Sequence, residues 1–101
     1  MGKLVRDRIP EIIEAEGRTP RTRILGDTAY ESALMDKLVE EAEELRSARG
    51  EDRPEEAADV YEVLVTLTTH LGMTLDNLAR LAERKRTERG GFERRIWLDS
   101  W

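Results

Sequence analysis

The chain has 101 residues, contains no cysteine and carries a formal net charge of −5, with 39% charged and 39% apolar residues. This length predicts one domain spanning residues 1–101, and the missing cysteines exclude a disulfide framework and a thiol nucleophile. The negative charge argues against a general affinity for nucleic acid or for an anionic membrane surface.

The apolar content bears on location and assembly. No stretch is apolar and long enough for a signal peptide or a membrane span, so we expect a soluble, cytoplasmic protein. A chain with this many charges has few apolar residues from which to build its own core. We therefore expect it to bury apolar surface against copies of itself, as at least a homodimer.

The hydrophobic periodicity predicts an all-α protein with four helices, at residues 7–16, 28–48, 54–71 and 75–89. Thr28 and Glu31 match a capping box, Pro54 suits a first helical turn, and Thr74 can cap the last helix. Glycines follow three of the helices, as is typical of helix ends, at Gly17, Gly72 and Gly90-Gly91. Residues 18–27 are predicted to be a basic linker, and the end of the chain is predicted to be a short extended tail.

Acidic residues recur in one pattern, as EEAEEL at residues 40–45 and as EEAADV at residues 55–60. The predicted apolar stripes are Leu34, Leu38, Ala42 and Leu45 in the second helix, and Val60, Val63, Leu64, Leu67 and Leu71 in the third. At about 100° per residue, Glu41 lies about 60° from Leu38, at the edge of its stripe, and Glu56 lies about 40° from Val60. Glu44 and Asp59 follow on the same edges, whereas Glu40 falls on the far side of its helix.

These carboxylates are expected to meet. The two helices are joined by a short loop and should pack antiparallel, which brings Glu41, Glu44, Glu56 and Asp59 level in two tiers. Such a cluster needs a neutralising charge. Lysine or arginine side chains could supply it, but Mg²⁺ or Mn²⁺ suits all-oxygen ligation better, and zinc is disfavoured without cysteine. We favour a Mg²⁺ site, with Mn²⁺ as a substitute.

Basic residues continue the apolar line of the last predicted helix. Lys85 and Arg89 lie within about 20° of the line through Leu75, Leu78 and Ala82. They have two interpretations: cations that complement the helix dipole, or cations that neutralise substrate phosphates held by the metal. His70 is more typical of a surface or core residue than of a ligand.

With these residues in view, the chain resembles the all-α NTP pyrophosphohydrolases of the MazG-like superfamily, whose signature is EExxE followed by ExxD. Here the two parts stand at residues 40–44 and 56–59. Two terminal blocks, KLVRDRIPEII at residues 3–13 and ERKRTERGGFERRIWL at residues 83–98, resemble the small house-cleaning group of that superfamily. Members of this group are often labelled phosphoribosyl-ATP pyrophosphohydrolase-like.

The resemblance implies an antiparallel bundle of about four helices per chain, completed by assembly as a homodimer or homotetramer. It also implies a Mg²⁺-dependent enzyme that cleaves a nucleoside triphosphate between the α and β phosphates, giving a nucleoside monophosphate and pyrophosphate. The implied metal ligands are Glu41, Glu44, Glu56 and Asp59. Ala82 departs from the superfamily, because the fuller MazG proteins have an asparagine at this position.

The resemblance gives Glu40 a role in orienting water. As a mechanistic hypothesis, Glu41 or Glu44 would accept a proton. Phosphate contacts are expected from Lys85, Arg89, Lys3 and Arg6. Two alternatives stay open: a phosphoribosyl-ATP pyrophosphohydrolase of histidine biosynthesis, and a non-catalytic helical module that dimerises or senses nucleotides.

Overall fold

The computed structural model describes residues 2–101, and within this range every regular element is an α-helix. The helices are α1 (Ile9–Ala15), α2 (Asp27–Ser47), α3 (Asp52–His70) and α4 (Leu75–Arg89). The predicted all-α class and the four helices are confirmed. Among residues 2–101, no helix combines the length and the apolar character needed to cross a membrane.

The ends of the helices agree with the sequence signals in most places. Gly72 and Gly90 follow α3 and α4 with positive φ angles of 81° and 85°, which glycine adopts without a steric penalty. The Thr74 hydroxyl accepts a hydrogen bond from the Asn77 backbone N–H at 3.0 Å, and the Asn77 side chain accepts one from the Thr74 N–H at 3.3 Å. This capping box fixes the start of α4.

The capping box predicted at Thr28 is wrong. Gly26 is the N-cap of α2, in an extended conformation, and no side chain caps this helix. Thr28 already lies inside the first turn, because the chain enters the helix at Asp27. The carboxylate of Asp27 suits the positive end of the helix dipole, which favours this earlier start.

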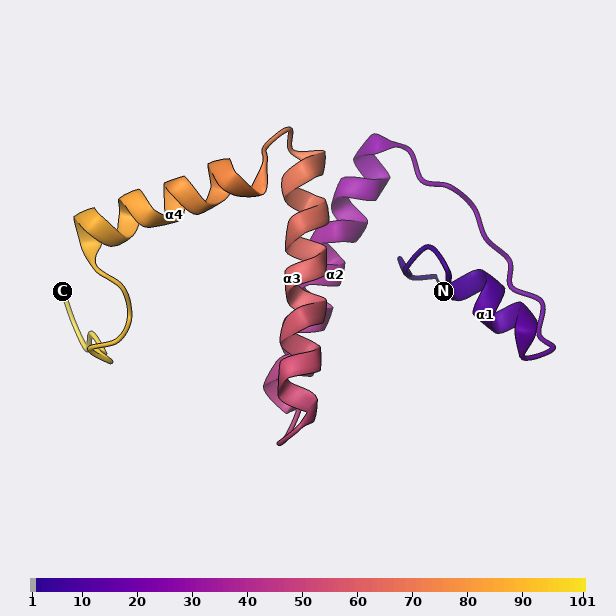
Figure 1. Cartoon of the computed structure of the whole chain (residues 1–101), viewed down its shortest axis with the longest axis horizontal. Coiled ribbons are helices and arrows are strands. Elements are labelled where there is room, and N and C mark those ends of the chain that lie inside the picture. Colours follow the sequence, from indigo (N-terminus) through magenta and orange to yellow (C-terminus); the bar gives the residue numbers. More distant parts are fainter. Residues whose placement is uncertain (1) are drawn as a thin grey trace.

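The centre of the molecule is the hairpin of α2 and α3, which run antiparallel and side by side (Figure 1). Leu34 of α2 and Leu67 of α3 are buried between them. The predicted stripes are only partly buried, since Leu38 and Leu45 are half-buried, Leu64 and Leu71 are exposed, and Ala42 is exposed. The hairpin therefore has a thin core.

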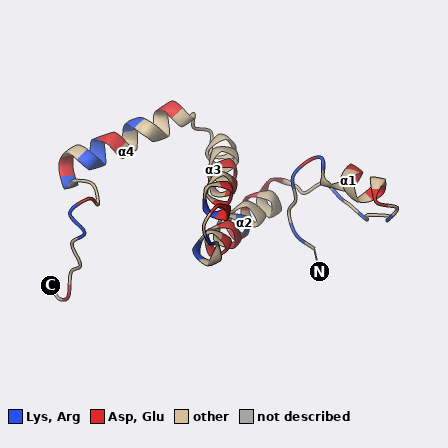
Figure 2. Cartoon of the chain, turned by 60° about the horizontal axis from the view of Figure 1, so that its bottom comes forward, with Lys and Arg blue, Asp and Glu red and all other residues tan. Residues whose placement is uncertain are grey.

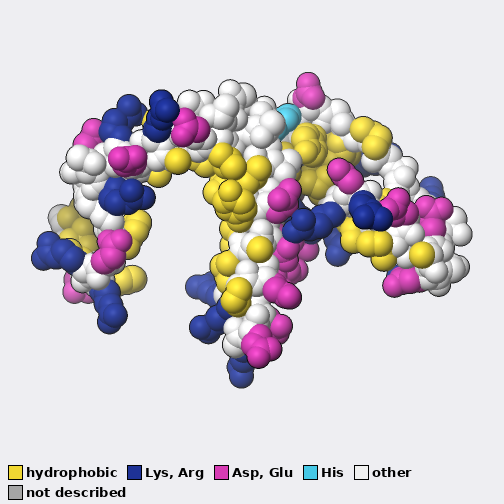
Figure 3. All heavy atoms as spheres, in the orientation of Figure 1, with side chains coloured by type: hydrophobic (Ala, Val, Ile, Leu, Met, Phe, Trp, Pro, Cys, Tyr) yellow, Lys and Arg dark blue, Asp and Glu magenta, His cyan; other side chains and the backbone are white. Residues whose placement is uncertain are grey.

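The other two helices do not close a four-helix bundle within residues 2–101. No other helix packs against α1, and α4 packs only against α3, from whose end it projects outward (Figure 1). Hydrophobic side chains gather on the side of α3 that faces α4, on the facing side of α4 and on the tail, around a hollow in the surface (Figure 3). The large exposed hydrophobic residues of α3, of α4, of the turn between them and of the tail are Tyr61, Leu64, Leu71, Leu75, Leu81, Phe92, Ile96, Trp97, Leu98 and Trp101.

Candidate functional site

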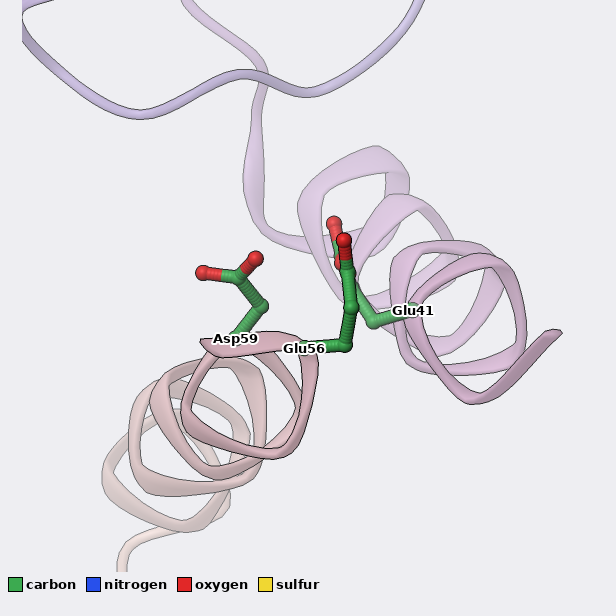
Figure 4. A group of neighbouring side chains, drawn as sticks. All are labelled: Glu41, Glu56 and Asp59. Carbon is green, nitrogen blue, oxygen red and sulfur yellow. The ribbon is translucent and has the colours of Figure 1, made fainter. Parts of the chain in front are cut away.

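Three of the predicted carboxylates come together on the facing edges of α2 and α3. Glu41, Glu56 and Asp59 each place one oxygen so that the three oxygens lie within 4.8 Å of one another. The three side chains project to the same side of the helix pair (Figure 4). The antiparallel register of the hairpin thus brings together residues that are 15 to 18 positions apart in the sequence.

Two oxygens of this cluster have no hydrogen-bond partner. Glu41 is buried, with 7% of its surface exposed, and its Oε2 atom makes no hydrogen bond. The Oε2 atom of Glu56 is likewise buried and unpaired. A buried carboxylate oxygen without a partner is costly, so both atoms are suited to accept a cation.

The surroundings of Glu41 disfavour its charged form. Burial is the main cause that raises the pKa of Glu41 above its ordinary value, and the neighbouring charge of Glu44 adds to the effect. The contact with Lys37 acts in the opposite direction but does not outweigh the other two. In the absence of a divalent cation, the cluster therefore carries a charge that the protein neutralises incompletely.

Two basic side chains supply part of the neutralisation. The Lys37 ammonium lies 3.2 Å from Glu40 Oε2 and 3.4 Å from Glu41 Oε1, and its side chain is largely buried, with 17% exposed. Burial lowers the pKa of Lys37, but the hydrogen bonds and charges of Glu40 and Glu41 together raise it above the ordinary value. Arg6, from the segment before α1, donates to Asp59 Oδ1 at 2.6 Å. The alternative of lysine and arginine neutralisation is therefore realised for one oxygen of Glu41 and one of Asp59.

The donor set fits a hard divalent cation. Mg²⁺ holds oxygen ligands at about 2.1 Å, so oxygens on opposite sides of the ion are about 4.2 Å apart. The observed 4.8 Å spread exceeds this by about 0.6 Å, which rotations of the flexible Glu side chains can close. Three carboxylates with no nitrogen or sulfur ligand match Mg²⁺ or Mn²⁺ better than zinc.

The remaining predicted acidic residues lie beside this cluster. Glu44 is exposed and is not one of the three grouped carboxylates, although it lies close enough to raise the pKa of Glu41. Glu40 is half-buried, because its carboxylate turns toward Lys37. Sequence reasoning placed Glu40 on the solvent side and took no account of Lys37, which stands four residues before Glu41, a spacing typical of helical ion pairs.

The predicted phosphate-binding residues are divided between two regions. Arg6 lies at the cluster, and Lys3 belongs to the same amino-terminal segment but is exposed. Lys85 and Arg89 are exposed on α4, which leads away from the acidic part of α2 and α3 (Figure 2). Within one chain, therefore, the basic pair and the carboxylates are not brought together.

A cavity of about 300 Å³ adjoins the carboxylates. The segment from Leu4 to Asp7 forms one wall, and α2 and α3 form the others. Arg6, Lys37, Glu41 and Asp59 all line this cavity, so a ligand that enters it meets both the acidic and the basic groups. Sequence analysis did not predict this cavity, because its wall depends on how the amino-terminal segment folds back across the hairpin.

We expect the substitution Arg6→Gln to tighten Mn²⁺ binding about two- to fivefold, because Arg6 occupies an oxygen of Asp59 that a metal would use, in a partly exposed pair. Titration calorimetry with Mn²⁺ measures the change. Arg8→Gln is the matched control, since Arg8 pairs with Glu11 at 2.7 Å outside the cluster. Equal or weaker Mn²⁺ binding by Arg6→Gln would show that Arg6 does not compete with the metal.

Comparison with known proteins adds one relative. No family model matches the chain, and no solved structure matches it. Over 52 residues the chain is 58% identical to an uncharacterized protein of Mycolicibacterium smegmatis, a match that covers 52% of this chain and 53% of that protein. The match thus spans about half the length of this relative, whose name assigns no activity.

Proposed function

We propose that this chain is a Mg²⁺-dependent nucleoside triphosphate pyrophosphohydrolase related to the MazG-like superfamily. It would cleave between the α and β phosphates and release a nucleoside monophosphate and pyrophosphate, in the house-cleaning of non-canonical nucleotides. Its three clustered carboxylates support this proposal most directly, because Glu41 and Glu56 each keep a buried oxygen unpaired on the side where Asp59 also points.

The roles of the side chains follow from their positions. Glu41, Glu56 and Asp59 would hold the metal, with Glu44 able to join by rotation of its exposed side chain. A bound Mg²⁺ would neutralise charge on the phosphate oxygens and lower the pKa of a water molecule that it carries. When Glu44 does not itself hold the metal, it would accept a proton from such a water, because it lies beside Glu41 but outside the three grouped carboxylates.

The amino-terminal segment would contribute to phosphate binding. Arg6 lies in the cavity wall and is 59% exposed, so its guanidinium can turn from Asp59 toward an incoming phosphate when a metal takes over Asp59. Lys3 belongs to the same segment and is exposed, so it would add positive charge to this segment. Lys37 would stay in place, since its ammonium is held between Glu40 and Glu41.

Assembly as a homodimer or homotetramer is part of the proposal. Large hydrophobic residues remain exposed around the hollow between α3 and α4, and exposed apolar patches of this kind mark protein interfaces. Lys85 and Arg89 lie on the helix that borders this hollow. In such an assembly, Lys85 and Arg89 of one copy would lie near the carboxylates of another copy.

The substitution Leu71→Glu is expected to convert the assembly to monomers, because it places a charge at an exposed leucine directly after α3, at the junction with α4. Light scattering coupled to size-exclusion chromatography measures the mass. Ile24→Glu serves as the control, since Ile24 is almost fully exposed in the linker between α1 and α2. A wild-type protein that elutes as a monomer at micromolar concentration would contradict the expected assembly.

The enzymatic proposal is tested by a screen of nucleotides for pyrophosphate release in Mg²⁺. The panel contains the standard nucleoside triphosphates, oxidised and deaminated ones, and phosphoribosyl-ATP. Release of pyrophosphate together with the monophosphate from at least one triphosphate is the expected result. Turnover of phosphoribosyl-ATP alone would instead favour the histidine-biosynthesis alternative.

A non-catalytic module is the second candidate, and one observation favours it. Arg6 pairs with Asp59 and Lys37 pairs with Glu41, so basic side chains of the protein neutralise part of the acidic cluster, as expected for a purely structural role. For such a module, Mg²⁺ alone would raise the melting temperature, nucleotides would add nothing, and no nucleotide in the panel would yield a product.

A further inference from the structure

The cavity beside the carboxylates changes character along its length. At one end its lining is charged, with Lys37, Glu41 and Asp59. Further along the two helices it is lined by an aromatic ring, two aliphatic side chains, a hydroxyl group and one carboxylate, from Tyr30, Leu34, Val63, Thr66 and Glu62. A ligand that fills this space therefore needs one charged part and one largely apolar part that also carries polar groups.

The order of these residues along the helices sets the distance between the two ends. At about 1.5 Å per residue, Leu34 and Tyr30 lie about 10 and 16 Å along α2 from Glu41. In the antiparallel α3, Val63 and Thr66 lie about 6 and 10 Å from Asp59 in the same direction. The apolar end is thus separated from the carboxylates by about the length of an extended nucleotide.

The ring of Tyr30 packs against a second aromatic ring. Its ring meets the ring of His70 edge to face, with centroids 5.2 Å apart, and His70 Nε2 lies 3.4 Å from Glu31 Oε1. Edge-to-face contacts of this kind fix the orientation of an aromatic ring. The half-buried ring of Tyr30 also lines the cavity, where it is available to a planar ligand.

We propose that the Tyr30 end of the cavity binds the nucleoside part of the substrate and that Tyr30 contacts the base. This inference rests on the proposed function, because the metal cluster would hold the phosphates at the opposite end. A cavity of about 300 Å³ is at the lower limit for small-molecule sites. The carboxylates account for binding of the phosphates, and the aromatic end accounts for the choice of a nucleotide over a simple polyphosphate.

The test compares two probes in the presence of Mg²⁺. One is the tightest-binding α,β-methylene analogue of the four deoxynucleoside triphosphates, and the other is inorganic tripolyphosphate, which lacks a nucleoside. Calorimetry gives both dissociation constants for wild type, Tyr30→Ala and Tyr30→Phe. Val39→Ala is the control, because Val39 is an exposed residue of α2 that neither lines the cavity nor belongs to the apolar surface proposed for assembly.

Tyr30→Ala is expected to weaken the nucleotide analogue about tenfold, the size of one base–aromatic contact, and to leave tripolyphosphate unchanged. Tyr30→Phe should bind both probes as wild type does, and so should Val39→Ala. Unchanged tripolyphosphate binding also shows that Tyr30→Ala is folded. Equal weakening of both probes, no weakening of either, or a wild type that binds both equally would overturn the inference.

These outcomes separate the inference from the proposed function. If wild type releases pyrophosphate but Tyr30→Ala binds the analogue normally, catalysis stands and the role of Tyr30 is wrong. If no nucleotide is hydrolysed but Tyr30→Ala still selectively weakens the analogue, nucleotide binding at Tyr30 stands and the enzymatic proposal fails.

Discussion

Glu41→Gln and Glu56→Gln are each expected to lower Mg²⁺-dependent pyrophosphate release by about a hundred- to a thousandfold or more. Each change replaces a negative ligand by a neutral amide at a position where a buried oxygen has no protein partner. Helix content should stay nearly intact, because glutamine keeps the shape and the helix propensity of glutamate. Initial rates at saturating Mg²⁺ and circular dichroism measure the two effects.

Two neighbouring glutamates provide controls for charge. Glu43→Gln and Glu55→Gln remove exposed carboxylates on α2 and α3 that lie outside the cluster, and both variants should retain the wild-type rate within about twofold. Wild-type rates for both Glu41→Gln and Glu56→Gln would refute the assignment of these residues. Equal losses of rate in all four variants would show that the effect comes from net charge and not from the site.

The metal-free protein is expected to lose stability as the pH rises, and Glu41→Gln should remove this loss. The pKa of Glu41 is raised from 4.5 by burial and by Glu44, so the folded state binds this proton more tightly than the unfolded state. Its favourable contribution is complete below about pH 4.5 and disappears as the pH rises through the higher pKa of the folded state. Lys37 adds no change in this range, because its raised pKa lies above 10.5.

Urea unfolding in EDTA between about pH 4 and pH 8 measures this dependence. At neutral pH, Glu41→Gln should raise the free energy of unfolding by about 1 kcal/mol, whereas Glu43→Gln should leave it unchanged. Mg²⁺ at a hundred times its dissociation constant should stabilise wild type by about 2.7 kcal/mol and should stabilise Glu41→Gln much less. A metal-free Glu41→Gln variant less stable than wild type at neutral pH would mean that the ion pair with Lys37 outweighs the burial of Glu41.

The difference between predicted and observed burial in α2 has a geometric cause. The predicted stripe was centred on Leu38, which places Ala42 about 40° to one side and Leu34 and Glu41 about 40° and 60° to the other. In the structure Leu34 and Glu41 are buried and Ala42 is exposed, so α2 turns toward α3 on the side of Glu41. The small alanine side chain fits either environment, and the sequence therefore did not fix this rotation.

Local sequence signals predicted the helices and most of their ends, whereas contacts between distant segments could not be predicted from the sequence. Gly72 and the Thr74 cap were recognisable, because positive φ and capping depend on adjacent residues. The antiparallel hairpin was also predictable, since a short loop leaves little choice. The contact of Arg6 with Asp59 joins residues 53 positions apart, and no local pattern indicates it. The outward course of α4 was missed for the same reason.

The central claim is that the facing carboxylates of α2 and α3 bind a divalent ion. Crystals grown with Mn²⁺ and measured at the manganese absorption edge test it most directly. We predict an anomalous peak about 2 Å from oxygens of Glu41, Glu56 and Asp59, with Arg6 displaced from Asp59. Crystals at saturating Mn²⁺ in which Arg6 still holds Asp59, with no anomalous peak among the three carboxylates, would contradict the claim.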